Sequence, residues 1–383
     1  MAATLPPLKS VFNTPSWTLK SKSVEASVSR TGGHLGPVTF IFGKRRISPL
    51  SVCPWHAEKP DPSLPPLLQV LRGDFLCLPF GGNDTPYKGR KFPPHGEPAN
   101  SPWHLESADL RPGIRELHLS QNQRITGGRV DKFITLLGND PVLYQSHVIS
   151  GIEGPMNPGH HAIVRFPETP GSGHISVSRF VHAQTLPTEF ELPENGGYSS
   201  LKPDSPFSSL KKVPLARGGF TDISIYPARK GFEDLIMLVS DPRLNFAWTA
   251  VTFPGEGYVW FTLKDPRILR NTIFWISNGG RHGKPWNGRH TARMGLEECT
   301  SYFHYGLAES AAANPLSRKG YPTVIPLGKK RPTCLNTIMA CALIPKGFDE
   351  VARIDKSPGG VTLQSRSGKK IAVPLTLGFL FGE

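Results

Sequence analysis

The sequence has few cysteines and lacks any long apolar run. Its five cysteines are odd in number, widely spaced and without a Cys-x-x-Cys motif. This pattern argues against a disulfide framework and against a structural zinc site. The sequence contains no run of about 18 apolar residues, the length needed for a membrane-spanning helix. The first residues also lack the apolar core of a secretory signal. These absences predict a cytoplasmic protein with no membrane partner.

The chain also lacks dense runs of one charge, although its formal net charge is +14. No run of Lys and Arg exceeds three residues, and the densest spots are residues 44–46 and 329–331. No motif of a nucleic-acid-binding protein accompanies the basic excess. We therefore expect dispersed surface charge and no nucleic-acid partner. A basic bias still leaves room for a phosphorylated or acidic sugar as ligand.

Glycine and proline, by contrast, are abundant. The chain of 383 residues contains 39 of each, about a fifth of the total, whereas average usage of the pair is nearer about 12%. Both are spread evenly between short apolar runs, which is typical of an all-β protein with many turns. The hydrophobic content of 38% is sufficient for a substantial core.

Short alternating or apolar segments predict the strands of a β-sandwich or barrel. Only residues 298–312 have helical composition, with Asn314-Pro315 predicted to end the helix. Because neither a tandem repeat nor a linker is evident, residues 1–20 are predicted to be an irregular lead-in and residues 20–383 a single domain. Strands are expected at residues 23–29, 38–42, 173–181, 221–226, 235–239, 258–263, 272–276 and 337–343, and a C-terminal hairpin at 361–364 and 370–377.

Two segments place histidines on constrained loops. His95 stands between Pro-Pro and Gly in FPPHGE, which would fix its imidazole as a hydrogen-bonding group; a structural turn histidine is the alternative. His160 and His161 follow the Pro/Gly turn of GPMNPGHHAI and lead into a strand. Adjacent strand residues face opposite sides, so one metal cannot easily use both, and one inward histidine is suited to act as a general acid. The sequence leaves open which of the two points inward, and a surface pair is the alternative.

The stretch from residue 275 to 298 is rich in Trp, Gly, Arg, His and carboxylates. It predicts a strand, a long polar loop and a second strand ending in Glu297 and Glu298. One of these adjacent carboxylates should face inward, where it can act as a general base. In the loop, Arg281 is suited to bind hydroxyls or a carboxylate, and Trp286 to stack on a sugar face. A structural loop with buried ion pairs is the alternative.

The order of these motifs, PHGEPANSPWHL, then GPMNPGHHAIVRFP, then MGLEE, resembles that of the aldose 1-epimerase (galactose mutarotase) superfamily. The early GGHLGPVTF is similar to the opening strand and Gly turn of the family. Residues 232–234 (FED) supply the acid expected between the middle histidine and the late glutamate. The resemblance spans roughly residues 20–383. It implies a large antiparallel β-supersandwich with few short helices, in agreement with the independent all-β prediction.

The resemblance also implies roles for individual residues. His161 corresponds to a general acid, Glu297 to the catalytic base and His95 to a substrate-orienting histidine, while Asp234 and Asn83 correspond to sugar ligands. The implied chemistry removes the proton of the anomeric hydroxyl, protonates the ring oxygen, and recloses the opened sugar in the opposite configuration. It requires a small-molecule sugar as partner and no metal or cofactor. The oligomeric state stays open.

The sequence departs from the familiar galactose mutarotases in two places. No Arg follows Asn83, and the Gly/Arg/His-rich loop at residues 279–290 is not typical of those enzymes. Both departures point to a separate branch of the superfamily with an unusual substrate or without activity. An isomerase that epimerises a sugar at C1 is the leading hypothesis. The alternatives are a non-catalytic carbohydrate-binding protein on the same fold and a protein related to polysaccharide lyases or hydrolases.

Overall fold

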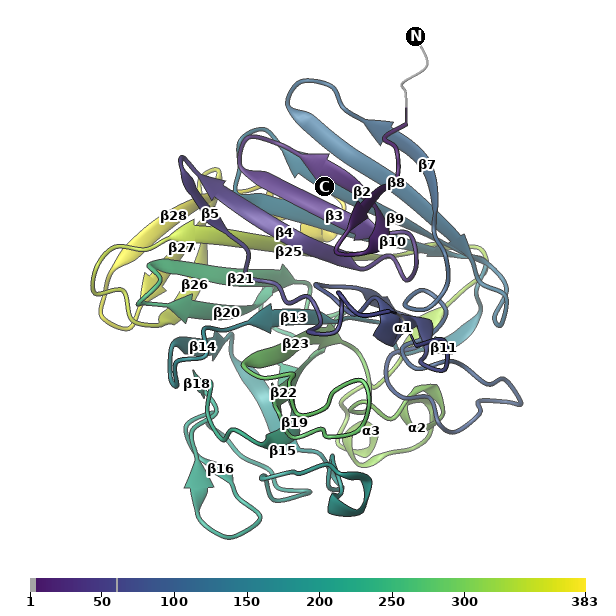
Figure 1. Cartoon of the computed structure of the whole chain (residues 1–383), viewed down its shortest axis with the longest axis vertical. Coiled ribbons are helices and arrows are strands. Elements are labelled where there is room, and N and C mark those ends of the chain that lie inside the picture. The colour runs from purple at the N-terminus through teal and green to yellow at the C-terminus, as the bar shows by residue number, and fades with distance from the viewer. Residues whose placement is uncertain (1–4, 60) are drawn as a thin grey trace.

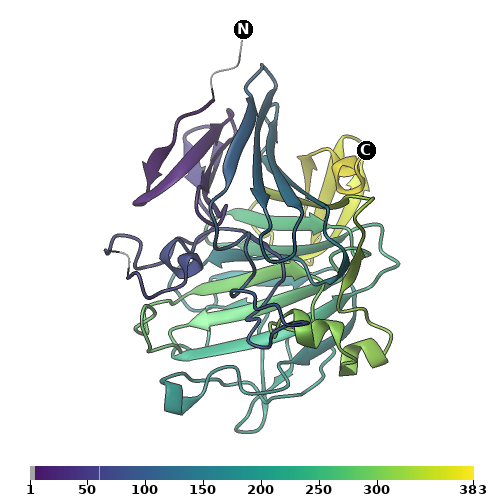
Figure 2. The ribbon, with the colours of Figure 1, turned by 90° about the vertical axis from the view of Figure 1, so that its right-hand side faces the viewer.

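Two large antiparallel β-sheets form the centre of the molecule (Figures 1 and 2). The computed structural model describes residues 5–59 and 61–383. In spatial order, the nine-stranded sheet consists of β18 (Ile225–Tyr226), β14 (Gly173–Val177), β20 (Ala247–Phe253), β21 (Tyr258–Lys264), β25 (Thr333–Leu343), β10 (Val142–Ser150), β9 (Arg129–Leu137), β8 (Ile114–Asn122) and β7 (His104–Asp109). The seven-stranded sheet consists of β15 (Phe180–Thr185), β19 (Phe232–Ser240), β22 (Asn271–Asn278), β23 (Arg293–Cys299), β12 (Gly159–His160) and β6 (Leu76–Cys77), with β13 (Ala162–Arg165) also paired to β23.

Smaller sheets and short helices complete the fold. The N-terminal sheet contains β1 (Lys9–Val11), β2 (Thr14–Lys20), β3 (Val24–Ser29), β4 (Leu35–Phe42) and β5 (Arg45–Ile47), and the C-terminal sheet contains β26 (Val351–Ser357), β27 (Gly360–Ser365) and β28 (Lys370–Pro374). Two ladders pair β11 (Gly154–Met156) with β24 (Ile325–Leu327) and β16 (Val213–Pro214) with β17 (Phe220–Thr221). The helices are α1 (Pro66–Gln69), α2 (Leu307–Ala311), α3 (Pro315–Arg318) and the 3₁₀ turns η1 (Pro193–Asn195) and η2 (Leu377–Phe381). Within the described part of the chain, no helix has the length and apolar character needed to span a membrane.

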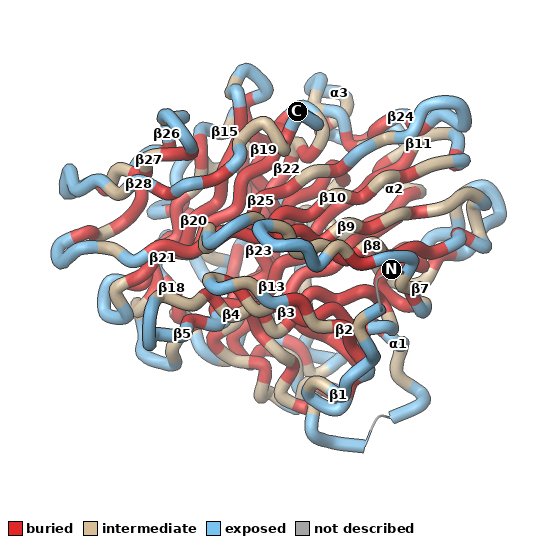
Figure 3. The backbone as a smooth tube through the Cα atoms, turned by 90° about the horizontal axis from the view of Figure 1, so that it is seen from above, coloured by how far each residue is buried: buried red, intermediate tan, exposed pale blue. Residues whose placement is uncertain are grey.

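The central strands are buried on both faces because both faces of each sheet are covered. Every residue of β20 and β21 is buried, and Gly257, at φ +62°, forms part of the turn between them. In β19, Ile236 and Leu238 belong to the core between the two sheets, whereas Leu235 and Met237 belong to a core on the outer face of the seven-stranded sheet. The chain between β5 and β7 contributes much of that outer core. Burial is accordingly concentrated in the strands and exposure in the peripheral turns (Figure 3).

The all-β architecture predicted from the sequence is confirmed. The C-terminal hairpin is also present, as β27 and β28, with Gly368 at φ +84° in its turn. The predicted strand at residues 173–181 is two strands, β14 and β15, which belong to different sheets. Only two-residue strands, β17 and β18, occur where one strand was expected at residues 221–226.

Two other expectations are corrected. Residues 9–11 and 14–20 form β1 and β2, where an irregular lead-in was predicted, because Trp17 and Leu19 are buried in the central core; residues 1–4 lie outside the described residues. The predicted helix at residues 298–312 is reduced to α2, since β23 continues to Cys299. Asn314 begins a helix instead of ending one. Its side chain accepts hydrogen bonds from two N–H groups of the first turn of α3, in a capping box.

Candidate active site

Strand pairing brings His161 and Glu297 into contact. Ala162, the first residue of β13, is opposite Leu296 in β23, so the preceding His161 lies beside Glu297. The distance from His161 Nε2 to Glu297 Oε1 is 3.2 Å, and both side chains are almost completely buried. The backbone N–H of His161 donates a hydrogen bond to the carbonyl oxygen of Phe75. The acid and the base expected from the sequence therefore form one dyad.

The neighbouring residues His160 and Glu298 point the other way, toward the nine-stranded sheet. His160 Nδ1 lies 3.1 Å from a carboxylate oxygen of Asp74. Glu298 forms a buried ion pair with Lys264 of β21, at 2.5 Å, and accepts a hydrogen bond from Thr249 of β20. Strand alternation therefore separates the two glutamates. Glu297 faces a cavity, whereas Glu298 connects the two sheets.

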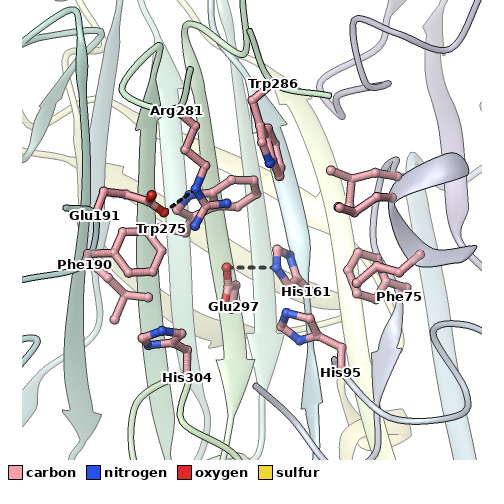
Figure 4. Close-up of a pocket in the computed structure, with 14 residues that line it drawn as sticks. Phe75, His95, His161, Phe190, Glu191, Trp275, Arg281, Trp286, Glu297 and His304 are labelled. Carbon is pink, nitrogen blue, oxygen red and sulfur yellow. Dashed lines mark hydrogen bonds and ion pairs between the residues drawn. The ribbon is translucent and has the colours of Figure 1, made fainter. Parts of the chain in front are cut away.

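The dyad lies in a cavity of about 230 Å³ on the outer face of the seven-stranded sheet (Figure 4). Among the residues selected from the sequence, His95, His161, Arg281, Trp286 and Glu297 line it together, and the rings of His95 and His161 are 4.9 Å apart. Within residues 5–59 and 61–383, no group of three or more His, Cys, Asp and Glu side chains is arranged to hold a metal ion. The remaining lining residues are Leu67, Leu68, Leu71, Phe75, Phe190, Glu191, Leu235, Trp275 and His304.

Most of these additional residues come from outside the sheet. Strands contribute Leu235, Trp275 and Glu297, which form a floor, while α1 and the loops form the walls. Sequence reasoning missed the walls because their signals are weak. The leucines of LPPLLQVL resemble an ordinary core segment, and Glu191 is one of several acids in a Pro-rich loop. Trp275 belongs to the Trp-rich stretch at residues 275–298, but the sequence alone does not indicate that its ring borders a cavity.

Arg281 is held in the cavity by aromatic rings and by one carboxylate. Its guanidinium carbon lies 4.9 Å from the ring centres of Phe190 and Trp286, and 5.4 Å from that of Trp275. Its Nε–H group donates a hydrogen bond to the carboxylate of Glu191. Cation–π contacts of this kind hold a planar guanidinium in one orientation. The pair presents donors and acceptors toward the cavity in a fixed arrangement.

Burial controls the protonation of the site. It raises the pKa of Glu297 well above the ordinary value, an effect opposed by the positive charge of Arg281. Burial is the main cause that holds the pKa of His161 well below its ordinary value, and the electrostatic effect of the neighbouring His95 is the next largest cause. Burial also lowers the pKa of His95 to about 3 and that of His304 to about 4. Burial therefore shifts the dyad toward a neutral carboxyl and a neutral imidazole.

Aromatic packing fixes the two histidines. The ring of Phe75 stacks on His161, with centres 4.6 Å apart, and also stacks on His34, at 4.2 Å. His95 has a positive φ of 59°. Its backbone N–H donates to the carbonyl oxygen of Gly81, and Nδ1 lies 3.2 Å from Cys77 Sγ. Both imidazoles are therefore held in position before any ligand enters.

Asn83, predicted as a sugar ligand, does not line the cavity. Its amide nitrogen donates to the backbone carbonyl oxygens of Pro79, Gly81 and Pro93, and its side-chain oxygen accepts from the N–H of Leu307. These bonds connect the loop after β6 to the start of α2. The placement corrects the prediction, since every polar atom of this side chain serves the backbone.

Asp234, also predicted as a sugar ligand, does not line the cavity either. Its carboxylate accepts hydrogen bonds from the N–H groups of Ser200 and Leu201 and from the Ser200 hydroxyl, on the face of β19 opposite the cavity side. The adjacent Glu233 is on the same face of β19 as Leu235 but does not line the cavity. It accepts a hydrogen bond from Trp275 Nε1 at 2.9 Å, and burial raises its pKa to about 7. Glu233 therefore orients the Trp275 ring.

We expect Glu297→Gln to become more stable relative to the wild type as the pH rises. Because burial raises the pKa of Glu297 above its ordinary value of 4.5, the folded protein retains a proton that the unfolded chain releases. The free energy of unfolding of the wild type therefore falls as the pH rises from about 4.5 toward the folded pKa, whereas glutamine does not titrate. Urea unfolding of both proteins between about pH 4 and pH 8 measures the difference. A difference that is constant with pH would contradict this account.

The two-sheet antiparallel sandwich, with its cavity on an outer sheet face, is the galactose mutarotase-like fold. A galactose mutarotase-like protein from Clostridium acetobutylicum matches with 11% identity and a TM-score of 0.56, over 88% of this chain and 98% of that one. A galactose mutarotase related enzyme from Lactobacillus acidophilus matches with 13% identity and a TM-score of 0.55, over 85% and 97%. An Escherichia coli K12 protein, provisionally assigned as an aldose 1-epimerase, matches with 14% identity and a TM-score of 0.55, over 86% and 99%. No family model and no curated protein sequence matches the chain.

Proposed function

We propose that the protein is an aldose 1-epimerase-type isomerase, which opens and recloses the ring of a reducing sugar. The observation that carries this proposal is the contact between His161 and Glu297 inside a cavity of about 230 Å³. Ring opening requires a base at the anomeric hydroxyl and an acid at the ring oxygen, two atoms bonded to the same carbon. A base and an acid 3.2 Å apart are spaced to reach both oxygens.

In the proposed reaction, the Glu297 carboxylate removes the proton from the hydroxyl on C1. His161, as the imidazolium, donates its Nε2 proton to the ring oxygen O5. The C1–O5 bond breaks, and its electron pair stays on O5 while C1 becomes an aldehyde. Rotation about C1–C2 and the reverse proton transfers then close the ring in the opposite configuration. The dyad holds one transferable proton before and after the reaction.

The effect of burial on the dyad is consistent with this scheme. A neutral Glu297 beside a neutral His161 contains the same number of protons as a carboxylate beside an imidazolium. A shift of one proton across the 3.2 Å contact therefore produces the reactive pair without exchange with solvent. Burial raises the pKa of Glu297, but the charge of Arg281 opposes this effect and so favours the carboxylate. Ring opening by the reactive pair returns both groups to the neutral state.

Glycoside hydrolysis is less well supported by the same cavity. It requires two carboxyl groups that act on one glycosidic bond. The second carboxylate that lines the cavity, Glu191, is paired with Arg281, whereas Glu297 contacts a histidine. The acid–base pair available to a ligand is therefore of the epimerase type.

Polarimetry tests the proposal directly. Freshly dissolved α-glucose, α-galactose and their 6-deoxy analogues are followed with and without the full-length protein. We expect the protein to accelerate the approach to the anomeric equilibrium of at least one sugar. If no sugar is accelerated while one of them binds, the protein is a carbohydrate-binding protein on this fold, and the epimerase proposal is wrong.

A further inference from the structure

The two ends of the dyad face chemically different walls. Glu191 and Arg281 lie beyond Glu297, whereas Phe75 lies beyond His161 on the opposite side of the cavity (Figure 4). The stacking of Phe75 on His161, at 4.6 Å, fixes this side. The cavity therefore has a charged pair on the side of Glu297, whereas on the side of His161 it has Phe75 and, as the one nearby hydrogen-bonding group among the described lining residues, His95.

Three leucines extend the apolar wall. Leu67 and Leu68 belong to α1, and Leu71 follows one turn later, so the spacing places all three on one side of the segment. All three line the cavity, and Leu67 and Leu71 share a buried cluster with Phe75. Their side chains contain no hydrogen-bonding group. A hydroxyl directed at this wall would lose its bonds to water without replacement.

The charges around the cavity do not favour an anionic ligand. Among the described residues that line the cavity, Arg281 is the one Lys or Arg side chain. Its Nε–H group already donates a hydrogen bond to Glu191. Glu297 adds a second carboxyl group, and burial holds the pKa values of His95 and His304 at about 3 and about 4, so both are neutral. The net charge of +14 is thus not reflected in the cavity, and a phosphate group would find no unpaired cation there.

We infer that the cavity is selective for a 6-deoxyaldose, a sugar with a methyl group instead of a hydroxymethyl group on C5. The inference rests on the proposed function, which places O1 at Glu297 and O5 at His161. The ring then continues from O5 to C5 past His161, and its C5 substituent meets Phe75 and the leucines. The hydroxyls on the far side of C1 meet Arg281, a donor, and Glu191, an acceptor.

Two series of three sugars, each differing only at C5, test the inference. The first is D-xylose, D-quinovose and D-glucose, and the second is L-arabinose, D-fucose and D-galactose, with hydrogen, methyl and hydroxymethyl at C5. In the series that matches the stereochemistry of the site, kcat/KM for mutarotation should be highest for the methyl sugar. We expect it to exceed that of the hydrogen and hydroxymethyl sugars by roughly 10-fold to 200-fold. Glucose 6-phosphate should be the poorest substrate.

A variant of the wall isolates the cause. Leu68 is only partly buried, so Leu68→Asn should fold and should reduce the preference for methyl over hydroxymethyl by about tenfold. Leu110→Asn, at an exposed leucine that does not line the cavity, should leave the preference unchanged. Equal or higher kcat/KM for the hydroxymethyl sugars in both series, or fastest turnover of the phosphate, would overturn the inference.

Binding distinguishes failure of the inference from failure of the proposed function. Trp275 and Trp286 line the cavity, so their fluorescence can report occupancy by each sugar of the series. If the protein binds sugars without accelerating mutarotation, the proposed function fails. A lower dissociation constant for the methyl sugars would then still support selection of the methyl group by the apolar wall. If it binds none of the sugars, both are overturned.

Discussion

Glu297→Gln is expected to reduce kcat for mutarotation by about 10²–10⁴-fold, the range that a positioned general base contributes. Glutamine has nearly the same shape and can still hydrogen-bond to His161, but it cannot accept the proton of the anomeric hydroxyl. The substrate should therefore still bind, and the loss should appear in kcat more than in KM. Polarimetry on the preferred sugar, with binding followed by Trp fluorescence, measures both quantities.

The matched control is Glu256→Gln, which makes the same change on the exposed turn between β20 and β21. This variant should have wild-type kcat and KM. If Glu297→Gln also retained wild-type kcat, Glu297 would not be the base, and the proposed mechanism would be wrong whatever the sugar. Loss of sugar binding by Glu297→Gln would instead indicate a structural contribution of the carboxyl group.

Glu298→Ala, one residue further along β23, is expected to destabilise the protein by about 3–5 kcal/mol. Glu298 pairs with Lys264 at 2.5 Å and accepts a hydrogen bond from Thr272 at 2.8 Å, between the two large sheets. Removal of the carboxylate leaves the ammonium of Lys264 buried without its counterion. Urea unfolding, followed by circular dichroism, gives the free energy of unfolding of variant and wild type.

The double variant Glu298→Leu/Lys264→Met is the control for this prediction. Replacing both charges by apolar groups of similar size removes the unpaired charge, so it should be much less harmful than Glu298→Ala. A small effect of Glu298→Ala, well below about 1 kcal/mol, would show that water or another group compensates Lys264. Substitution of these adjacent glutamates is thus expected to have different main effects, loss of turnover at Glu297 and loss of stability at Glu298.

The sequence was sufficient to predict the all-β architecture, and the resemblance in motif order suggested His161 and Glu297 as a pair, whose side chains the structure brings into contact. Strand alternation alone was not sufficient to decide whether His160 or His161 points inward. Strand alternation gives two opposite faces, but both faces of β23 are buried, so burial pattern alone does not reveal which face borders a cavity. The choice is made by pairing across strands, which brings together residues far apart in the sequence.

The same limitation explains the errors at Asp234 and Asn83. In β19, Asp234 and Glu233 are adjacent acids in a buried strand, and the sequence contains no signal for which one is on the cavity side. Asn83 has a positive φ of 57°, and its amide is needed to satisfy backbone groups of an irregular loop. A polar residue in a glycine-rich loop serves a ligand or the loop itself, and local sequence does not separate these roles.

The separation between the floor and the walls of the cavity has a consequence for evolution. Glu297, the proposed base, is on a strand of the central sandwich, and His161, the proposed acid, lies between two strands paired to it, whereas the residues proposed to recognise the sugar come from α1 and from loops. Loops tolerate substitution and insertion better than the packed elements that they connect. Under the proposed function, descendants of such a protein can therefore acquire selectivity for other sugars by changes in α1 or in the loop bearing Arg281 while they retain the two proton-transfer residues. Selectivity should diverge quickly in this lineage, and the reaction slowly.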